Sequence, residues 1–415
     1  MVTPSTALVD ERLSVVVEGV GPRQLFTLRA VTFDQRDRAW EAEAEFTAGP
    51  DGAADLTQVA PSPGGSYEGV DEMGLFWSAS PTVEGAQIAH RPSLDYVTRL
   101  ELIVDGVVVD SAVIRRRFDA SDLLREEIEE AGLVGAYYRP QGPGPFPGVV
   151  VFAGSDGGLE SAEWRASLLA SRGVAALAVA VFNHEGRPDD LVELPLEYGV
   201  EAFEWLLDQP ETGEVGVLGF SKGSELALNL AARETRVASV VAISPTAYVW
   251  PGVTDGPPET RSSWTWKGEP LPAIPWSIGP VAGSMFGRGP PFRLRVLYEE
   301  SLEAAPPAIR NNAEIPVSEI VAPVLLVSGE DDGSWPATSM AEAVKETILE
   351  SDPAADVTHL QYPGAGHLLF WDYLPVTTAE RNAGQIFGGT AAGTAAARAD
   401  SWPRLQSFLR RTLVE

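Results

Sequence analysis

Val215-Gly-Val-Leu-Gly-Phe-Ser-Lys-Gly-Ser-Glu-Leu-Ala-Leu-Asn-Leu230 is the stretch from which the fold class of this chain can be inferred. The apolar run up to Leu218 predicts a buried strand, and the Leu- and Ala-rich segment after Gly223 predicts a helix. Between them stands G-x-S-x-G centred on Ser221, in the strand–turn–helix context of a nucleophile elbow. Such a tight turn needs small residues on either side, and Gly219 and Gly223 meet that demand. The alternative is an ordinary β–α turn with an incidental serine.

The same turn indicates how an oxyanion could be held. It leaves the backbone amide of Lys222 at a helix N-terminus, aimed at a charge developing next to Ser221. In an elbow of this type the second amide comes from the loop after a neighbouring strand, here the apolar run 148–152. That loop is Gly154-Ser-Asp-Gly-Gly158, and we expect Ser155 to be the second donor. A phosphate-binding loop is the rival interpretation, but the glycine spacing matches neither a P-loop nor G-x-G-x-x-G.

A serine nucleophile needs a base, and the chain has four histidines. In this fold the order along the chain is Ser, then Asp or Glu, then His, so His90 and His184 come too early. His359 lies within a predicted strand, 356–362, and is interpreted as structural. His367 follows that strand in a loop, where parallel sheets place their catalytic groups. We therefore predict that His367 is the base.

The carboxylate that orients the base should lie between the serine and the histidine in sequence. The loop Ser328-Gly-Glu-Asp-Asp-Gly-Ser-Trp335 follows the buried run 323–328 and offers Glu330, Asp331 and Asp332. A short acidic loop is commonly just solvated, but this one stands after a buried strand and before the loop of the predicted base. Asp332 is the predicted triad acid, with Asp331 as the alternative.

Composition limits the remaining possibilities. The chain has 415 residues, 44% hydrophobic and 21% charged, as in a soluble globular protein of two domains. A net charge of −29 argues against partners such as nucleic acid or anionic membranes, and no apolar run is long enough to span a membrane. Cysteine is absent, which excludes disulfides and thiolate metal sites, and with no visible secretory signal we expect a cytoplasmic protein. Because His184-Glu185 is an isolated pair and no His cluster exists, neither a metal nor a cofactor is expected.

The pattern along the chain changes near residue 118. Residues 1–117 predict an all-β, immunoglobulin-like sandwich, because short alternating runs are separated by turns and Asp105-Gly106 signals a hairpin. His90 is interpreted as a surface or loop residue there. Arg115-Arg-Arg117 is interpreted as a solvated strand end or an interdomain contact, with a phosphate-binding patch as the alternative. Residues 118–415 alternate buried strands and helices, which predicts a mostly parallel, doubly wound sheet, and the Pro-, Gly- and Trp-rich segment 244–318 predicts a cap over it.

Further motifs stand in chain order around the elbow: Pro145-Phe-Pro-Gly148 before Phe152-Ala-Gly-Ser-Asp-Gly-Gly158, Gly219-Phe-Ser-Lys-Gly-Ser-Glu-Leu226, Trp266-Lys-Gly-Glu-Pro-Leu-Pro272, Gly329-Glu-Asp-Asp-Gly-Ser-Trp335, Tyr362-Pro-Gly-Ala-Gly-His367, Gly384-Gln-Ile-Phe-Gly-Gly389 and Ser401-Trp-Pro-Arg-Leu-Gln-Ser-Phe-Leu409. Together they resemble the type I acyl-CoA thioesterases and bile acid-CoA:amino acid N-acyltransferases, which are α/β-hydrolases with an N-terminal β-sandwich. The resemblance covers most of residues 118–415 and is weaker before them.

The resemblance implies a Ser/Asp/His enzyme that cleaves acyl thioesters, with coenzyme A as part of a small-molecule substrate rather than as a cofactor. In the family a serine nucleophile implies transfer to water, and a cysteine implies transfer to glycine or taurine, so Ser221 in a cysteine-free chain favours hydrolysis. The loop 182–188 and most of the cap carry no family motif, and the acidic composition fits coenzyme A poorly. Transfer or cyclisation onto an amine or alcohol therefore stays open, as does a natural-product ester, and the oligomeric state is not specified.

Overall fold

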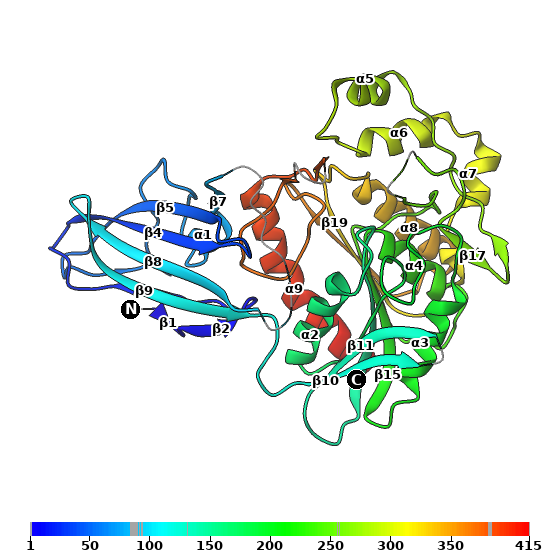
Figure 1. Ribbon diagram of the computed structural model, residues 1–415, viewed down its shortest axis with the longest axis horizontal. Coiled ribbons are helices and arrows are strands. Elements are labelled where there is room, and N and C mark those ends of the chain that lie inside the picture. Colours follow the sequence, from blue (N-terminus) through cyan, green and yellow to red (C-terminus); the bar gives the residue numbers. More distant parts are fainter. Residues whose placement is uncertain are drawn as a thin grey trace.

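The computed structural model describes residues 2–83, 90, 92, 94–130, 132–254, 256, 258–380 and 384–414. The N-terminal part consists of β-sheets, whereas the rest is a mostly parallel sheet with helices against it (Figure 1). The predicted fold class, an α/β-hydrolase sheet preceded by an all-β part, is confirmed.

The N-terminal part, called the sheet domain here, contains two sheets. The larger one has the order β2-β9-β8-β4-β5-β7, and its strands are β2 (Thr6–Leu8), β4 (Leu25–Phe33), β5 (Ala39–Thr47), β7 (Ser80–Pro81), β8 (Tyr96–Val104) and β9 (Val107–Arg117). The smaller one has the order β1-β3-β6, from β1 (Val2–Thr3), β3 (Ser14–Val17) and β6 (Ala54–Asp55), and a short helix α1 (Gly74–Trp77) follows. Strand β5 buries every second side chain, as its alternating sequence predicts.

The second part is built on an eight-stranded sheet in the order β10-β11-β13-β12-β15-β16-β19-β20. Its strands are β10 (Leu124–Glu130), β11 (Leu133–Arg139), β12 (Phe146–Phe152), β13 (Ala175–Val179), β15 (Thr212–Phe220), β16 (Val240–Ile243), β19 (Val324–Gly329) and β20 (Val357–Tyr362). The pairings from β13 to β20 are parallel, and β10 and β11 form an antiparallel edge. Strands β13, β16 and β19 are buried throughout because helices cover both faces.

Two groups of helices cover the two faces of this sheet. Helices α2 (Glu160–Ser171) and α9 (Ala391–Leu413) share one apolar core with the sheet domain, whereas α3 (Glu197–Leu207), α4 (Lys222–Ala231) and α8 (Ala337–Ser351) pack in a second core. The first core therefore runs without interruption from the sheet domain to one face of the large sheet. None of the helices in the described ranges is both long enough and apolar enough to cross a membrane.

The segment 244–318 leaves the alternation of strands and helices, as expected for a cap. It contains β17 (Trp264–Trp266), β18 (Glu269–Pro270), α5 (Pro280–Arg288), α6 (Arg295–Ala304), α7 (Pro307–Ala313) and a 3₁₀ turn (Val317–Glu319). Strand β17 also pairs with β14 (Leu194–Pro195), and a small hairpin of β21 (Ala379–Glu380) and β22 (Gln385–Ile386) lies further along. In Figure 1, α5, α6 and α7 lie together beyond the end of the large sheet, away from the sheet domain.

One element begins later than its sequence indicates. The amphipathic pattern from Leu194 predicts a helix over 194–208, but α3 starts at Glu197. Leu194 and Pro195 pair with β17 instead, and Leu194 donates its backbone N–H to Ser263 O at 2.8 Å. The partner strand belongs to the cap, so a tertiary contact overrides the local helical pattern.

Candidate active site

The turn at Ser221 joins β15 to α4 and has the strained backbone of an elbow. Ser221 has φ 54° and ψ −120°, a backbone conformation that residues other than glycine rarely adopt. A Cβ added at Gly219 would lie 2.0 Å from the carbonyl oxygen of Gly223. A Cβ at Gly223 would lie 2.3 Å from the carbonyl oxygen of Ala153. Both glycines are therefore required by close backbone approach, and the second one brings the elbow against the loop after β12.

Ser221, His367 and Asp332 come from three separate loops and meet in one place. The Nε2 atom of His367 lies 2.9 Å from Ser221 Oγ, and its Nδ1 atom lies 2.7 Å from Asp332 Oδ2. All three side chains are buried. This is the relay a nucleophilic serine needs: a ring nitrogen that accepts the hydroxyl proton and a carboxylate that fixes the other nitrogen as a donor.

The carboxylate of Asp332 is fixed by its own loop. Its Oδ1 accepts backbone N–H bonds from Ser334 at 2.7 Å and Trp335 at 3.2 Å, which leaves Oδ2 for the imidazole. Asp331, the alternative acid, is exposed, and its backbone joins Ala365 and Gly389. The geometry thus places Asp332, rather than Asp331, against His367.

The backbone of His367 is held on both sides. Its N–H donates to Phe387 O at 3.0 Å, and its carbonyl oxygen accepts from Ser244 Oγ at 2.8 Å. The ring of Phe387 lies parallel to the imidazole, with centroids 6.4 Å apart, and the ring of Phe220 lies at 5.1 Å. Two aromatic rings therefore lie near the imidazole, in addition to its two polar partners.

The loop 153–158 lies directly beside the nucleophile. A Cβ built on Gly154 would lie 3.4 Å from Ser221 Cβ and 3.3 Å from the ring of Phe220. Within the described ranges, the backbone amides of Ser155 and Lys222 donate to no other residue. An oxyanion hole needs amides of this kind, so the lack of another acceptor in these ranges is compatible with both predicted donors, whose role stays a prediction.

The side chains of Lys222 and Glu225 form a buried ion pair behind the elbow that the sequence did not reveal. Lys222 Nζ lies 2.7 Å from Glu225 Oε2. The other carboxylate oxygen accepts the backbone N–H of Trp250 at 3.1 Å and the indole N–H of Trp264 at 2.9 Å. Burial lowers the pKa of Lys222 and raises the pKa of Glu225, although each charge opposes that shift in its partner. Since both tryptophans belong to the segment 244–318, Glu225 ties the helix behind the nucleophile to the cap.

A series of aromatic rings leads from the histidine to the cap, beginning with Trp335 of the Asp332 loop. Trp335 lies 6.0 Å from the His367 ring, Tyr298 lies 5.6 Å from Trp335, and Trp250 and Trp276 complete the group at 4.6 and 5.1 Å from Tyr298. Burial first, and then the carboxylates of Glu225 and Asp332, raise the pKa of the Tyr298 phenol well above its ordinary value. The phenol therefore stays protonated.

The other three histidines lie away from Ser221. His359, on β20, contacts Ser328 Oγ at 2.8 Å and Glu342 at 3.0 Å, and thereby joins three elements beneath the Asp332 loop. His184 contacts the carbonyl oxygen of its neighbour Glu185. His90 lies outside any strand, as a loop residue should, but its side chain is 14% exposed and it contacts Asp372. No group of three or more metal-binding side chains occurs in the part of the chain that the structure describes.

Known family models match both parts of the chain. The family model described as acyl-CoA thioester hydrolase/BAAT N-terminal region matches residues 10–130, and the BAAT/acyl-CoA thioester hydrolase C-terminal model matches residues 194–263 and 290–415. The chain is 31% identical over 428 residues to the bile acid-CoA:amino acid N-acyltransferase of Mus musculus, covering 99% of this chain and 97% of that protein. It is 30% identical over 417 residues to acyl-coenzyme A thioesterase 1 of Mus musculus, covering 97% and 94%.

A solved structure is also similar at a much lower level. The puromycin-hydrolysing peptidase of Mycobacterium tuberculosis is 12% identical, with a TM-score of 0.47 over 97% of this chain and 55% of that chain. Such a low likeness has no bearing on substrate.

Proposed function

Because this chain belongs to the acyl-CoA thioester hydrolase/BAAT family of enzymes, we propose that it hydrolyses an acyl-CoA thioester through an acyl-enzyme on Ser221. The observation that carries this proposal is the contact of His367 Nε2 with Ser221 Oγ at 2.9 Å, together with its Nδ1 contact with Asp332 at 2.7 Å. The family covers both hydrolases and N-acyltransferases, so the acceptor has to be argued from this chain's own residues.

In the first half of the reaction, Ser221 Oγ attacks the thioester carbonyl carbon while His367 Nε2 takes the hydroxyl proton. Asp332 holds the imidazole in the required tautomer and stabilises the imidazolium that forms. The carbonyl oxygen becomes an oxyanion, which the amides of Lys222 and Ser155 bind. When the tetrahedral intermediate collapses, the carbon–sulfur bond breaks and the imidazolium gives its proton to the departing thiolate of coenzyme A. The acyl group is left as an ester on Ser221.

In the second half, His367 removes a proton from a water molecule as that water attacks the ester. The second tetrahedral intermediate uses the same two amides, and its collapse returns the proton to Ser221 Oγ and releases the free acid. Only side chains and amides of the chain enter these steps, and coenzyme A enters as part of the substrate. The proposal therefore includes no cofactor and no metal.

Water is proposed as the acceptor because the nucleophile is a serine. An oxygen ester reacts less readily with amines than a thioester does, and the cysteine-free chain has no thiol that could form an acyl thioester. Transfer to an amine is the second candidate, since a relative named as an N-acyltransferase is 31% identical over nearly the full chain.

A hydrolysis panel tests the proposal. Acyl-CoA thioesters of increasing chain length and simple esters are incubated with the wild-type chain, with Ser221→Ala as the control, and free acid is measured. Glycine, taurine and alcohols are then added separately. We expect free acid from the wild type only. If conjugates form faster than free acid, the proposal of hydrolysis fails and transfer to an amine or alcohol takes its place.

Replacing the predicted base gives an independent test. His367→Ala should lower kcat by about 10³-fold or more, as loss of a triad base does in other serine enzymes. His359→Ala is the matched control, because its ring does not contact Ser221. Near-normal turnover of the His367 variant would rule out its assignment as the base.

A further inference from the structure

The segment 368–376, which leaves His367 directly, is held by residues of the sheet domain. Tyr373 donates its backbone N–H to Val9 O at 3.0 Å, and Val376 donates its own to Trp77 O at 3.0 Å. The carbonyl oxygen of Tyr373 accepts from Arg116 Nη1 at 3.2 Å. The catalytic histidine proposed above is thus the first residue of a loop whose far part is bonded to another domain.

Asp372 is the centre of this contact. Its Oδ2 lies 3.1 Å from His90 Nε2, and its Oδ1 accepts from Arg398 Nη1 at 3.1 Å and from the backbone N–H of Leu374 at 2.9 Å. Arg398 also donates from Nε and Nη2 to Leu368 O, the residue next to His367. One buried carboxylate therefore connects the sheet domain, helix α9 and the backbone adjoining the base.

Both charged groups of this connection are buried. The carboxylate of Asp372 is fully buried and the guanidinium of Arg398 is 2% exposed. Burial alone would raise the pKa of Asp372, but Arg398 and His90 hold it below its ordinary value, so the carboxylate stays charged. Removing the partner of a buried charge strongly destabilises a protein, so separating Asp372 from Arg398 would lower the stability of the fold. The aromatic ring of Phe370 fills the remaining space, with its centroid 4.7 Å from His90 and 5.8 Å from Phe220, the neighbour of the nucleophile.

We propose that Asp372 and His90 are positioning residues. They hold the loop of His367 so that its Nε2 atom stays within hydrogen-bond distance of Ser221 Oγ. The sheet domain is then a part of the catalytic apparatus and not only an attached module. The inference rests on the proposed function in so far as it takes His367 to be the base.

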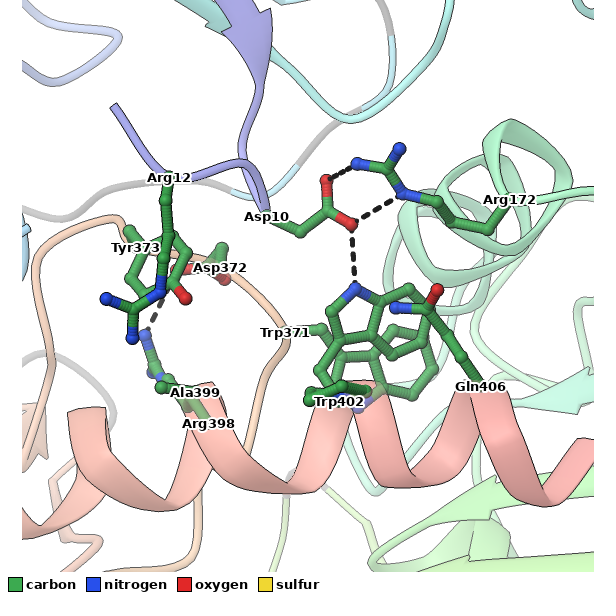
Figure 2. A pocket seen from close by; sticks show the side chains of 11 residues that line it. Asp10, Arg12, Arg172, Trp371, Asp372, Tyr373, Arg398, Ala399, Trp402 and Gln406 are labelled. Carbon is green, nitrogen blue, oxygen red and sulfur yellow. Dashed lines mark hydrogen bonds and ion pairs between the residues drawn. The ribbon is translucent and has the colours of Figure 1, made fainter. Parts of the chain in front are cut away.

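A second buried aspartate at the same domain contact supplies the matched control. Asp10 of the sheet domain accepts from Arg172 Nε at 2.8 Å and from the indole N–H of Trp402 at 2.7 Å. Figure 2 shows both groups on the wall of one pocket, with Asp10 between Arg172 and Trp402 and with Asp372 beside Arg398. Asp10 bridges the domains as Asp372 does, but its partners are α9 and the end of α2 rather than the loop of His367.

The experiment compares Asp372→Asn, His90→Leu and His90→Gln with Asp10→Asn. The second-order rate at which a fluorophosphonate labels Ser221 is followed by intact mass, and kcat and KM are measured for an acyl-CoA thioester. Thermal unfolding and circular dichroism verify that each variant is folded. The amide nitrogen of Gln occupies the place of His Nε2 and can donate to Asp372, so His90→Gln should restore most of what His90→Leu loses.

We expect Asp372→Asn and His90→Leu to lower both the labelling rate and kcat by about 10- to 100-fold with KM little changed, because small displacements of a catalytic group have costs of this size. Asp10→Asn should stay within about twofold of wild type even where its unfolding temperature falls. Equal rates in all four variants would overturn the inference, as would losses in Asp10→Asn that match the others. If wild-type Ser221 is labelled but acyl-CoA is not hydrolysed, the proposed substrate fails while these rate differences still support positioning. A wild-type chain that resists labelling would overturn both.

Discussion

At Gly223 the backbone of the elbow touches the backbone of the neighbouring loop. A Cβ there would lie 2.3 Å from Ala153 O and 2.5 Å from Phe152 O, and neither carbonyl can move without shifting β12. Gly223→Ala should therefore lower the free energy of unfolding by about 1–3 kcal/mol and displace the amide of Lys222. Gly213 is the control, because a Cβ on it would meet only ordinary contacts at 3.5 and 3.7 Å. Urea unfolding and fluorophosphonate labelling measure both effects, and equal behaviour of the two alanine variants would contradict the prediction.

The two neighbouring aspartates differ in what an amide would do to them. Asp332→Asn keeps the shape of the side chain but replaces the acceptor that fixes the tautomer of His367, so kcat should fall by about 10³–10⁴-fold. Asp331 is exposed, and the carboxylate that contacts the imidazole is that of Asp332. Steady-state hydrolysis by Asp331→Asn should match wild type. A larger loss at Asp331 than at Asp332 would reverse their assignment.

The buried pair behind the elbow can be tested by removing one charge or both. Lys222→Met leaves the carboxylate of Glu225 buried without its cation, which should lower the free energy of unfolding by about 3–5 kcal/mol. In the double variant Lys222→Met/Glu225→Leu no charge is left unpaired, so part of this loss should be recovered. Urea unfolding of the two variants measures the difference. A double variant less stable than the single one would show that the tryptophan contacts of Glu225 matter more than its charge.

These residues also mark the limit of the sequence argument. Gly219, Ser221 and Gly223 could be found because an elbow requires them at fixed spacing. The predicted order of acid and base narrowed the candidates to a few residues, and the structure places Ser221, Asp332 and His367 together; their catalytic roles stay predictions. The role of Glu225 could not be inferred, since its partners Trp250 and Trp264 are distant in sequence and no spacing rule connects them. The sequence predicts a surface or loop position for His90, because nothing near it in sequence indicates its contact with Asp372.

At the scale of elements, helix α8 is joined to β20 by a pair that depends on pH. The hydrogen bond from His359 lowers the pKa of Glu342. A carboxyl group whose pKa is lower in the folded chain than in the unfolded chain contributes stability above the unfolded value, and this contribution is lost as the pH falls through the folded value. The unfolding temperature of the wild type should therefore fall more steeply than that of Glu342→Gln as the pH is lowered from about 5 to 3, a range that begins near the ordinary pKa of a glutamate and continues below it. Scanning calorimetry at several pH values measures the two slopes, and parallel slopes would contradict the assignment.

Element types were more predictable than element ends. Period-two patterns identify strands of the sheet domain, and short apolar runs identify the parallel strands. Both signals are local, because burial of one or both faces of a strand determines which of its residues are apolar. The start of α3 was predicted three residues early, since the pairing of β14 with β17 depends on where the cap folds back. The internal arrangement of residues 244–318 could not be predicted either. Their helices are short and lie between prolines and glycines, which leaves no clear period.

At the scale of the whole molecule, the continuous apolar core that includes α2, α9 and the sheet domain has a thermodynamic consequence. Domains that share a core and a buried charge contact should unfold together rather than in sequence. We therefore expect one calorimetric transition in which the van't Hoff and calorimetric enthalpies agree. Asp10→Asn, which removes a bridge between the domains, should lower the midpoint. Two resolved transitions in the wild type would show that the sheet domain is thermodynamically independent.

The contact between Asp10 and Trp402 joins the first strands of the chain to a helix that follows every other element described here. During synthesis on the ribosome, the sheet domain emerges long before α9 exists. The part of the shared core that α9 supplies is then missing until residues 391–413 have been made. The nascent chain is consequently exposed to chaperones and to misassembly for most of its translation. A slow stretch of translation between the two domains would lengthen the period in which the sheet domain lacks α9, and it would add no native contacts. In a chain of independent domains, the same pause would instead give the first domain time to fold.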